Sequence, residues 1–302
     1  MSPRAWIELI VLSFIWGGTF LSVRIALDDL GPLWVVAHRV FWAAVILWAV
    51  VLATGGRVPL TARVWIGFLG MGLLNNVFPF TLQAWGQLHI ESGLTSILNA
   101  GTAIWGALVA ALFLADERLT LRKSVGVLVG FFGVATAIGL SNLMAFDLRS
   151  LGQLAVVLST ISYAFAGVWG RRMLGRLSPV VSAAGMLLMS SVTMIPIAWV
   201  VEGPLVLTLA ADTILALAYV TVVATAGAYL LYYRVLGMAG SSNVMLCTLL
   251  IAPVAIVLGA LFLGEDLAPR AFWGFGILAL GLLILNGTVP LPGDAKRAAQ
   301  KG

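Results

Sequence analysis

The sequence contains long stretches without a single charged side chain, and these exclude most soluble folds. Residues 92–115, 124–146, 177–201 and 271–293 carry no Asp, Glu, Lys or Arg. About 20 consecutive apolar residues make a helix long enough to cross the hydrocarbon core of a bilayer. Only 10% of the chain is charged and 61% is hydrophobic, whereas about 25% of a soluble domain is charged. The pattern predicts an all-α polytopic membrane protein.

Charged residues, glycines and prolines divide the chain into ten runs of spanning length. Each run is expected to be a helix, because backbone polar groups inside lipid must be hydrogen-bonded within their own segment. The connections are short, so no soluble domain is inserted. The expected spans are 5–27, 32–53, 64–85, 93–114, 121–140, 150–170, 179–201, 211–235, 241–263 and 270–288.

One segment of the chain occurs twice, 148 residues apart. LFLADERLTLRKSVGVLVGFFG at 112–133 returns as LFLGEDLAPRAFWGFGILALG at 261–281. Each half holds five spans, an odd number, so the second half must enter the membrane from the opposite side. The sequence therefore predicts two inverted-topology repeats of five helices, with a binding site between them near mid-membrane. The predicted boundaries are 1–143, 144–290 and a cytoplasmic tail, 291–302.

The distribution of lysine and arginine predicts the orientation, because loops on the cytoplasmic side carry the excess of positive charge. An even number of spans puts both termini on one side. If that side is the cytoplasm, only four of the 17 basic residues lie outside, namely Arg24, Arg39, Arg149 and Arg270. We therefore expect no buried lysine or arginine, which disfavours permanently charged or polyphosphorylated substrates.

Residues that carry chemistry are scarce in the spans. No span has a carboxylate near its centre, and the single cysteine, Cys247, excludes an internal disulfide and a multi-cysteine metal site. No phosphate-binding G-x-x-x-x-G-K-[ST] motif is present. We therefore expect no catalytic residue, cofactor, metal or nucleic-acid partner. The lack of a mid-span titratable group favours gradient-driven facilitation, with a proton-coupled antiporter or a membrane-embedded enzyme as alternatives.

Uncharged polar and aromatic side chains do reach the middle of the spans. Asn76, Phe80 and Gln83 recur at helical spacing and share one face of the third span. Aromatic rings normally gather at the membrane interfaces, so mid-span rings are candidates for a cavity, although packing between helices is the competing explanation. A cavity of this kind suits an uncharged or zwitterionic molecule with a hydrophobic group. The predicted substrate-binding residues are Trp16, Asn76, Phe80, Gln83, Asn99, Trp105, Tyr163 and Tyr229.

Prolines and glycines suggest mechanical roles. Pro79 in the third span and Pro253 in the ninth remove a backbone donor and should kink their helices. Both are hinge candidates, and a bend that serves packing alone is an equal alternative. Small residues let helices approach closely in membranes. Close packing of the fifth and tenth spans is predicted from Gly126, Gly130, Gly133, Gly274 and Gly281.

The chain resembles the drug/metabolite transporter superfamily, and within it the EamA-like bacterial exporters. The likeness is carried by Trp16-Gly17-Gly18-Thr19-Phe20, the acidic turns around Glu117 and Glu265, Pro253 and the glycine-spaced closing helices. It covers residues 5–288 and departs from the family pattern at Trp105, which aligns with Pro253. The resemblance implies a bacterial inner-membrane exporter. It is closest to exporters of aromatic amino acids and related amphiphilic metabolites, which would be its small-molecule partners alongside membrane lipid.

Overall fold

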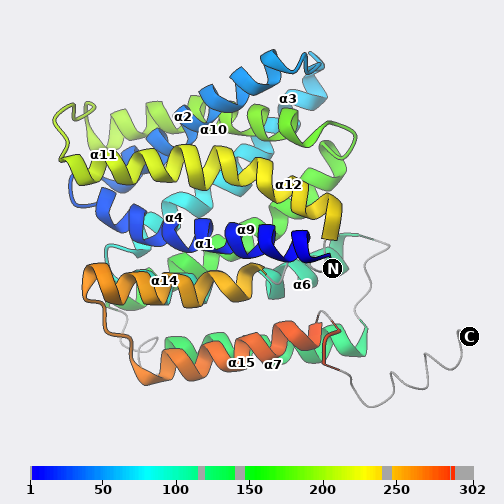
Figure 1. Ribbon diagram of the computed structural model, residues 1–302, viewed down its shortest axis with the longest axis vertical. Coiled ribbons are helices and arrows are strands. Elements are labelled where there is room, and N and C mark those ends of the chain that lie inside the picture. Colours follow the sequence, from blue (N-terminus) through cyan, green and yellow to red (C-terminus); the bar gives the residue numbers. More distant parts are fainter. Residues whose placement is uncertain (1, 115–119, 140–146, 240–246, 286, 290–302) are drawn as a thin grey trace, which may run out of the picture.

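The computed structural model describes residues 2–114, 120–139, 147–239, 247–285 and 287–289, and every regular element within them is helical (Figure 1). The helices are α1 (Pro3–Ala26), α2 (Pro32–Ala53), α3 (Ala62–Gly72), η1 (Leu73–Val77), α4 (Phe78–Gly86), α5 (Ser92–Asn99), α6 (Thr102–Phe113), α7 (Leu121–Ile138), α9 (Leu148–Met173), α10 (Pro179–Glu202), α11 (Ala211–Ala218), η2 (Tyr219–Gly227), α12 (Ala228–Ala239), α14 (Cys247–Leu263) and α15 (Pro269–Leu285).

These helices have the length and apolar character of membrane spans. Eight helical segments of the described chain have at least 18 residues and sufficient hydropathy to cross a bilayer, and two shorter apolar helices complete the set. Large hydrophobic side chains such as Leu128, Phe132 and Trp273 are exposed on the outside, which is where a membrane protein contacts lipid. The predicted all-α polytopic architecture is confirmed, and α2 covers the expected span 32–53.

Local sequence chemistry determines where several helices begin. Ser2 precedes Pro3, and its hydroxyl accepts a hydrogen bond from the backbone N–H of Ala5 at 3.2 Å. Ser178 and Pro179 repeat this arrangement at the start of α10. A serine before the first turn satisfies one free N–H group, and proline in that turn removes a donor that would have no partner.

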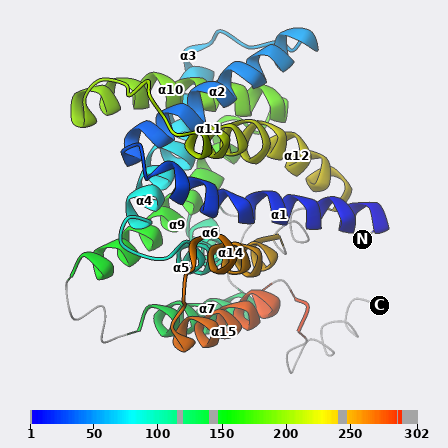
Figure 2. The same cartoon turned by 60° about the vertical axis from the view of Figure 1, so that its left-hand side comes forward.

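The two halves of the chain pack on each other in reciprocal pairs. α1 packs on α14, and α9 packs correspondingly on α6, while α2 lies against α10 and α7 against α15 (Figures 1 and 2). α1 and α9 are corresponding helices of the two halves, and so are α6 and α14, so each of these two contacts is the counterpart of the other. Such paired contacts are expected between two inverted repeats. The predicted boundary between residues 143 and 144 and the predicted tail, 291–302, lie outside the described residues, so the division into 1–143 and 144–290 stays a prediction.

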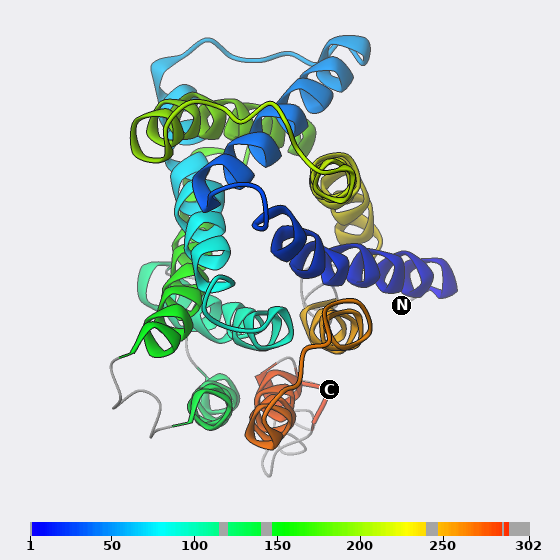
Figure 3. The same cartoon turned by 90° about the vertical axis from the view of Figure 1, so that its left-hand side faces the viewer.

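α7 and α15 form a pair along one edge of the bundle (Figure 3). A Cβ atom on Gly133 would lie 2.4 Å from the backbone nitrogen of Leu278, and one on Gly274 would lie 2.3 Å from that of Ala137. The two backbones therefore approach as closely as small residues in membrane helices allow. The glycine spacing had predicted that each of these spans packs closely against a neighbour, without identifying that neighbour.

Two spans widen to a π-helix near their middle. η1 separates α3 from α4, and η2 separates α11 from α12. A shift of 147 residues places η1 inside η2, so the two segments occupy corresponding positions. Pro79 is the second residue of α4, so only Phe78 separates it from η1, and a wider turn relieves the clash between its ring and the preceding turn. Pro253, by contrast, lies inside an uninterrupted α14.

Candidate substrate pathway

The bundle has two ends, which differ in their contacts. α1 starts at the end that we call the N-terminal face. It finishes at the distal face, which also carries the connecting segments 27–31, 87–91, 203–210 and 264–268. The polar residues inside the spans lie between these two faces.

One polar cluster joins α10 and α12 to η1. Asn75 donates through Nδ2 to the Tyr229 hydroxyl at 3.1 Å, and Asn76 donates through Nδ2 to Ser190 Oγ at 2.9 Å. The Tyr229 hydroxyl also lies 3.5 Å from Asn76 Oδ1. Asn76 is fully buried, so its amide links helices in this conformation. The structure brings the predicted residues Asn76 and Tyr229 together and adds Asn75, which the sequence analysis had not selected.

A second cluster joins α4, α5 and α9. Gln83 donates through Nε2 to Asn99 Oδ1 at 2.9 Å and to Ser159 Oγ at 3.0 Å. One turn earlier on α4, Phe80 contacts Tyr163 edge to face, with 6.5 Å between the ring centroids. Four predicted site residues therefore meet in two neighbouring contacts, each made across helices.

The two mid-span tryptophans lie in apolar surroundings. Trp16 contacts Tyr232 with 5.7 Å between ring centroids and packs on a cluster of α1, α12 and α14. Trp105 contacts Phe131 of α7 at 4.6 Å and packs on a separate small cluster of α6 and α9. The structure therefore does not bring these two predicted residues to the amide groups.

Arg39 corrects the expectation that no lysine or arginine is buried among the spans. It stands on α2, where its Nε donates to Thr225 Oγ1 of η2 at 3.0 Å. Its guanidinium carbon lies 3.7 Å above the centre of the Phe80 ring. The sequence analysis had assigned Arg39 to the outer side because it follows the start of the helix by only seven residues. Its partners on η2 and α4 show that it points into the bundle.

Two cavities lie on either side of the Phe80–Tyr163 contact. The smaller, of about 20 Å³, has room for one water molecule and is lined by Phe20, Arg39, Phe80, Gln83 and Gln87. The larger, of about 290 Å³, lies toward the N-terminal face and is mainly apolar, with Thr102, Gly106, Tyr163, Gly167 and Thr248 in its wall. A Cβ atom on Gly106 or Gly167 would meet nothing within 4 Å.

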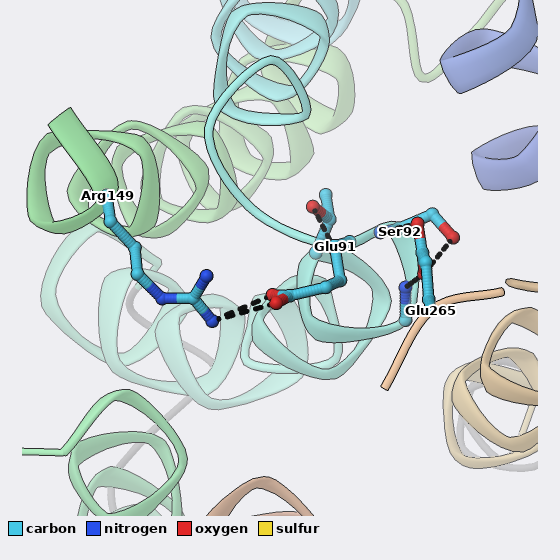
Figure 4. Close-up of polar contacts among 6 residues, drawn as sticks. Glu91, Ser92, Arg149 and Glu265 are labelled. Atoms are coloured by element: carbon cyan, nitrogen blue, oxygen red, sulfur yellow. Dashed lines mark hydrogen bonds and ion pairs between the residues drawn. The ribbon is translucent and has the colours of Figure 1, made fainter. Parts of the chain in front are cut away.

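Carboxylates tie the two halves together at the distal face. Glu265 accepts hydrogen bonds from the Ser92 backbone N–H and hydroxyl, both at 2.8 Å, and Glu91 accepts two from Arg149 at 2.8 and 3.0 Å (Figure 4). Glu202 likewise accepts from the first backbone N–H groups of α2. Carboxylates at a helix N-terminus satisfy free donors and complement its positive dipole end. We call Glu202, Glu265, Asp29 and the Glu91–Arg149 pair the distal clasp.

Two further features stabilise the distal clasp: two glycines with positive φ beside the glutamates, and the hydrogen bonds of the Asp29 carboxylate. Gly203 and Gly264 adjoin the two capping glutamates and have φ values of 86° and 63°, which only glycine adopts without strain. Asp29 Oδ2 accepts a hydrogen bond from the Ala210 backbone N–H at 2.7 Å. That bond, with one to Thr213, lowers the pKa of Asp29 below its ordinary value of 3.8.

Among the residues that the structure describes, no group of three or more His, Cys, Asp or Glu side chains could hold a metal ion. Cys247 is buried and its sulfur accepts a hydrogen bond from the Ser13 hydroxyl at 3.1 Å. The polar groups described between the two faces are amides, hydroxyls and the guanidinium of Arg39, which can bind and orient a molecule.

Comparison with known proteins matches this architecture to one family. The EamA-like transporter family matches residues 4–139 and again residues 150–287. A solved crystal structure of a protein that is 17% identical aligns over 94% of this chain and 98% of its own, with a TM-score of 0.64. At that identity the likeness shows the fold alone.

Two relatives carry names that state a cargo. A probable amino-acid metabolite efflux pump of Escherichia coli is 24% identical, over 94% of this chain and 95% of its own length. A probable terminal-alkyne amino-acid exporter of Streptantibioticus cattleyicolor is 24% identical, over 95% and 94%. An uncharacterized transporter of Archaeoglobus fulgidus is 25% identical, over 93% and 98%.

Proposed function

Since this chain belongs to the EamA-like transporter family, we propose that it exports amino acids with aromatic or hydrophobic side chains and related small amphiphilic metabolites. The sequence resemblance to the family is confirmed by the match over both halves of the chain. The names of the Escherichia coli and Streptantibioticus relatives support an amino-acid cargo.

The observation that carries the proposal is the composition of the region between the two cavities. Phe80 and Tyr163 offer aromatic faces there, while Gln83 and Asn99 offer amide groups, and these residues come from both halves of the chain. Aromatic rings bind an apolar side chain, and a few placed polar groups orient the rest of the molecule. An amphiphilic amino acid needs both.

Alternating access accounts for the unequal cavities. We propose that this conformation is closed at the distal face and hollow toward the N-terminal face, and that rocking of the two halves reverses the arrangement. With both termini in the cytoplasm of a bacterial cell, as the lysines and arginines favour, the larger cavity would receive cargo from the cytoplasm. An exporter must load its cargo on that side.

We propose gradient-driven facilitation as the mode of coupling. In the described part of the chain, the residues that line the two cavities include no carboxylate and no histidine. A proton-coupled antiporter is the second candidate, and His38 favours it, because its Nε2 is buried on α2 without a hydrogen-bond partner in the described residues. Imidazole is the side chain whose charge changes most readily near neutral pH.

Transport by the purified full-length protein in liposomes tests the proposal. Saturable, ATP-independent counterflow of labelled phenylalanine, competed by tyrosine and leucine, is the expected result. No flux of any member of a broad amino-acid panel would contradict the amino-acid assignment. Accumulation driven by an imposed pH gradient, and lost in His38→Gln, would replace facilitation with proton coupling. Empty liposomes and an unrelated membrane protein provide the background.

A further inference from the structure

We propose that Arg39 binds the carboxylate of the transported molecule, so that the cargo is selected as a carboxylate-bearing amphiphile. The inference rests on the proposed transport function and names the group by which the same pathway recognises its cargo. Three observations support it: the position of Arg39, its N–H groups that have no partner among the described residues, and a second polar atom in the same cavity.

The first argument is the depth of Arg39. It follows Pro32, the first residue of α2, by seven positions, which places it roughly 10 Å along the helix at 1.5 Å per residue. Its side chain meets η2 and α4, since Nε bonds Thr225 and the guanidinium lies over Phe80. It therefore lines the small cavity inside the bundle.

The second argument is that no carboxylate of the described residues balances the charge of Arg39. Among the described residues, its only hydrogen bond is the one from Nε to Thr225, and no carboxylate pairs with it. Cations within membrane spans are costly and normally pair with an anion or line a pathway. The N–H groups on Nη1 and Nη2 stay available in this cavity.

The third argument is geometric. A guanidinium is a planar fork that matches a carboxylate with two parallel hydrogen bonds. Thr225 and the Phe80 ring restrict its rotation, so the fork is held in place before the cargo arrives. In the same cavity, Gln87 Oε1 is buried without a hydrogen-bond partner in the described residues. An acceptor beside a fixed cation suits a zwitterion, with the carboxylate on Arg39 and the ammonium group on Gln87.

The two cavities give the cargo a route to Arg39. Phe80 lines the small cavity and Tyr163 the larger, and the two rings meet edge to face. Separation of these rings would join the cavities and admit the carboxylate, while the apolar side chain remained among the aromatic residues. In the conformation described, one water molecule at most fills the place of the carboxylate.

The test compares three ligands that differ in one group each. L-phenylalanine carries both charged groups, phenylalaninamide lacks the carboxylate, and 3-phenylpropionate lacks the ammonium group. Binding to the full-length protein in lipid nanodiscs is measured by calorimetry. We expect phenylalaninamide to bind at least about tenfold more weakly than phenylalanine, because a buried charge-assisted pair is lost. Equal binding of the acid and the amide overturns the inference, even if phenylalanine is transported.

Variants separate recognition from folding. Arg39→Gln should bring the ratio of the acid and amide affinities close to one, and Arg39→Lys, which keeps the charge and loses the fork, should give an intermediate ratio. Arg24→Gln is the matched control, since Arg24 pairs with Asp28 near the surface. A ratio unchanged in Arg39→Gln overturns the assignment. Binding of 3-phenylpropionate alone supports Arg39 as the carboxylate site and contradicts the amino-acid cargo.

Discussion

The two faces of the bundle are built differently. At the distal face, Glu202 and Glu265 from one half of the chain bond the first backbone N–H groups of α2 and α5 from the other. At the N-terminal face, Glu8 pairs with Arg4 and with Arg234, whose side chain is 56% exposed. The cavity of about 290 Å³ lies on this second side.

In the closed state that we propose for the distal face, this difference would hold the face shut without a thick layer of side chains. Backbone N–H groups at a helix start are fixed in direction, so a carboxylate that binds two of them fixes the position of a whole helix. An ion pair between two side chains, such as Glu8 and Arg234, fixes only the flexible ends of those side chains and not the helices that carry them. Closure of the distal face therefore depends on few bonds and should respond strongly to their removal.

The largest effect is expected from breaking the two helix caps together. In Glu202→Gln with Glu265→Gln, neutral acceptors replace charged ones, which should weaken distal closure by about 2 kcal/mol and raise opening about 30-fold. Labelling of a Val35→Cys reporter by a membrane-impermeant maleimide measures it. Asp266→Asn, beside Glu265 and exposed, should leave the labelling rate unchanged. An unaltered rate in the double variant would show that the caps do not hold the face shut.

Filling the larger cavity tests the N-terminal face of the bundle, on whose side this cavity lies. Gly106→Phe places a ring where a Cβ meets nothing within 4 Å, so we expect normal folding and at least about tenfold slower phenylalanine flux. Gly276→Phe is the control, because Gly276 also borders open space but is exposed on α15. Equal flux in both variants would remove this cavity from the pathway. Thermal unfolding of each variant checks the fold.

A smaller effect is expected for the ion pair in the distal clasp. The side chains of Arg149 and Glu91 are 36% and 22% exposed, and exposed pairs contribute up to about 1 kcal/mol. Arg149→Gln should therefore speed labelling of the same Val35→Cys reporter by about fivefold at most. Salt screens such pairs, so the labelling rates of wild type and variant should become more similar in concentrated salt. An effect larger than that of the double glutamate variant would reverse our ranking.

The smallest effect concerns Asp29 and pH. Because the Ala210 N–H lowers the pKa of Asp29 below 3.8, its contact is fully present above pH 3.8 and is lost only as the pH falls below that value. The ratio of the reporter labelling rates of Asp29→Asn and wild type, each measured at the same pH, should therefore be the same at pH 7 and pH 5. A ratio that fell to one at pH 5 would show that the carboxylate titrates higher.

The sequence predicted the spans well because their signal is local. Long apolar runs, bounded by Pro32 or by Ser178 before Pro179, placed α2 and α10 within a residue or two of their observed ends. The pairing of α7 with α15 was partly foreseen for a similar reason. Gly133 and Gly274 mark a close approach, although nothing in the sequence stated that each would find the other.

The pathway was harder to predict because it depends on how each helix is rotated. Apart from His38 and Arg39, α2 is apolar around its whole circumference, so no pattern indicated that Arg39 would face η2 and α4. The glutamate caps of the distal clasp join residues more than 160 positions apart, such as Leu33 and Glu202, and no local pattern reports such a pair. Trp105 was predicted to line the pathway, but its ring turns toward Phe131.

The π-helical segments have a consequence for any mutational scan of this protein. An α-helix advances about 100° per residue, and a π-helix inserts one residue into a turn. Sensitivity to substitution along α3 and α4 should therefore follow one helical wheel up to Leu73 and resume, out of phase, after Val77. The same change of phase should occur across η2, between α11 and α12. A single helical wheel fitted to either span would therefore assign the residues beyond the π-helix to the wrong neighbouring helix.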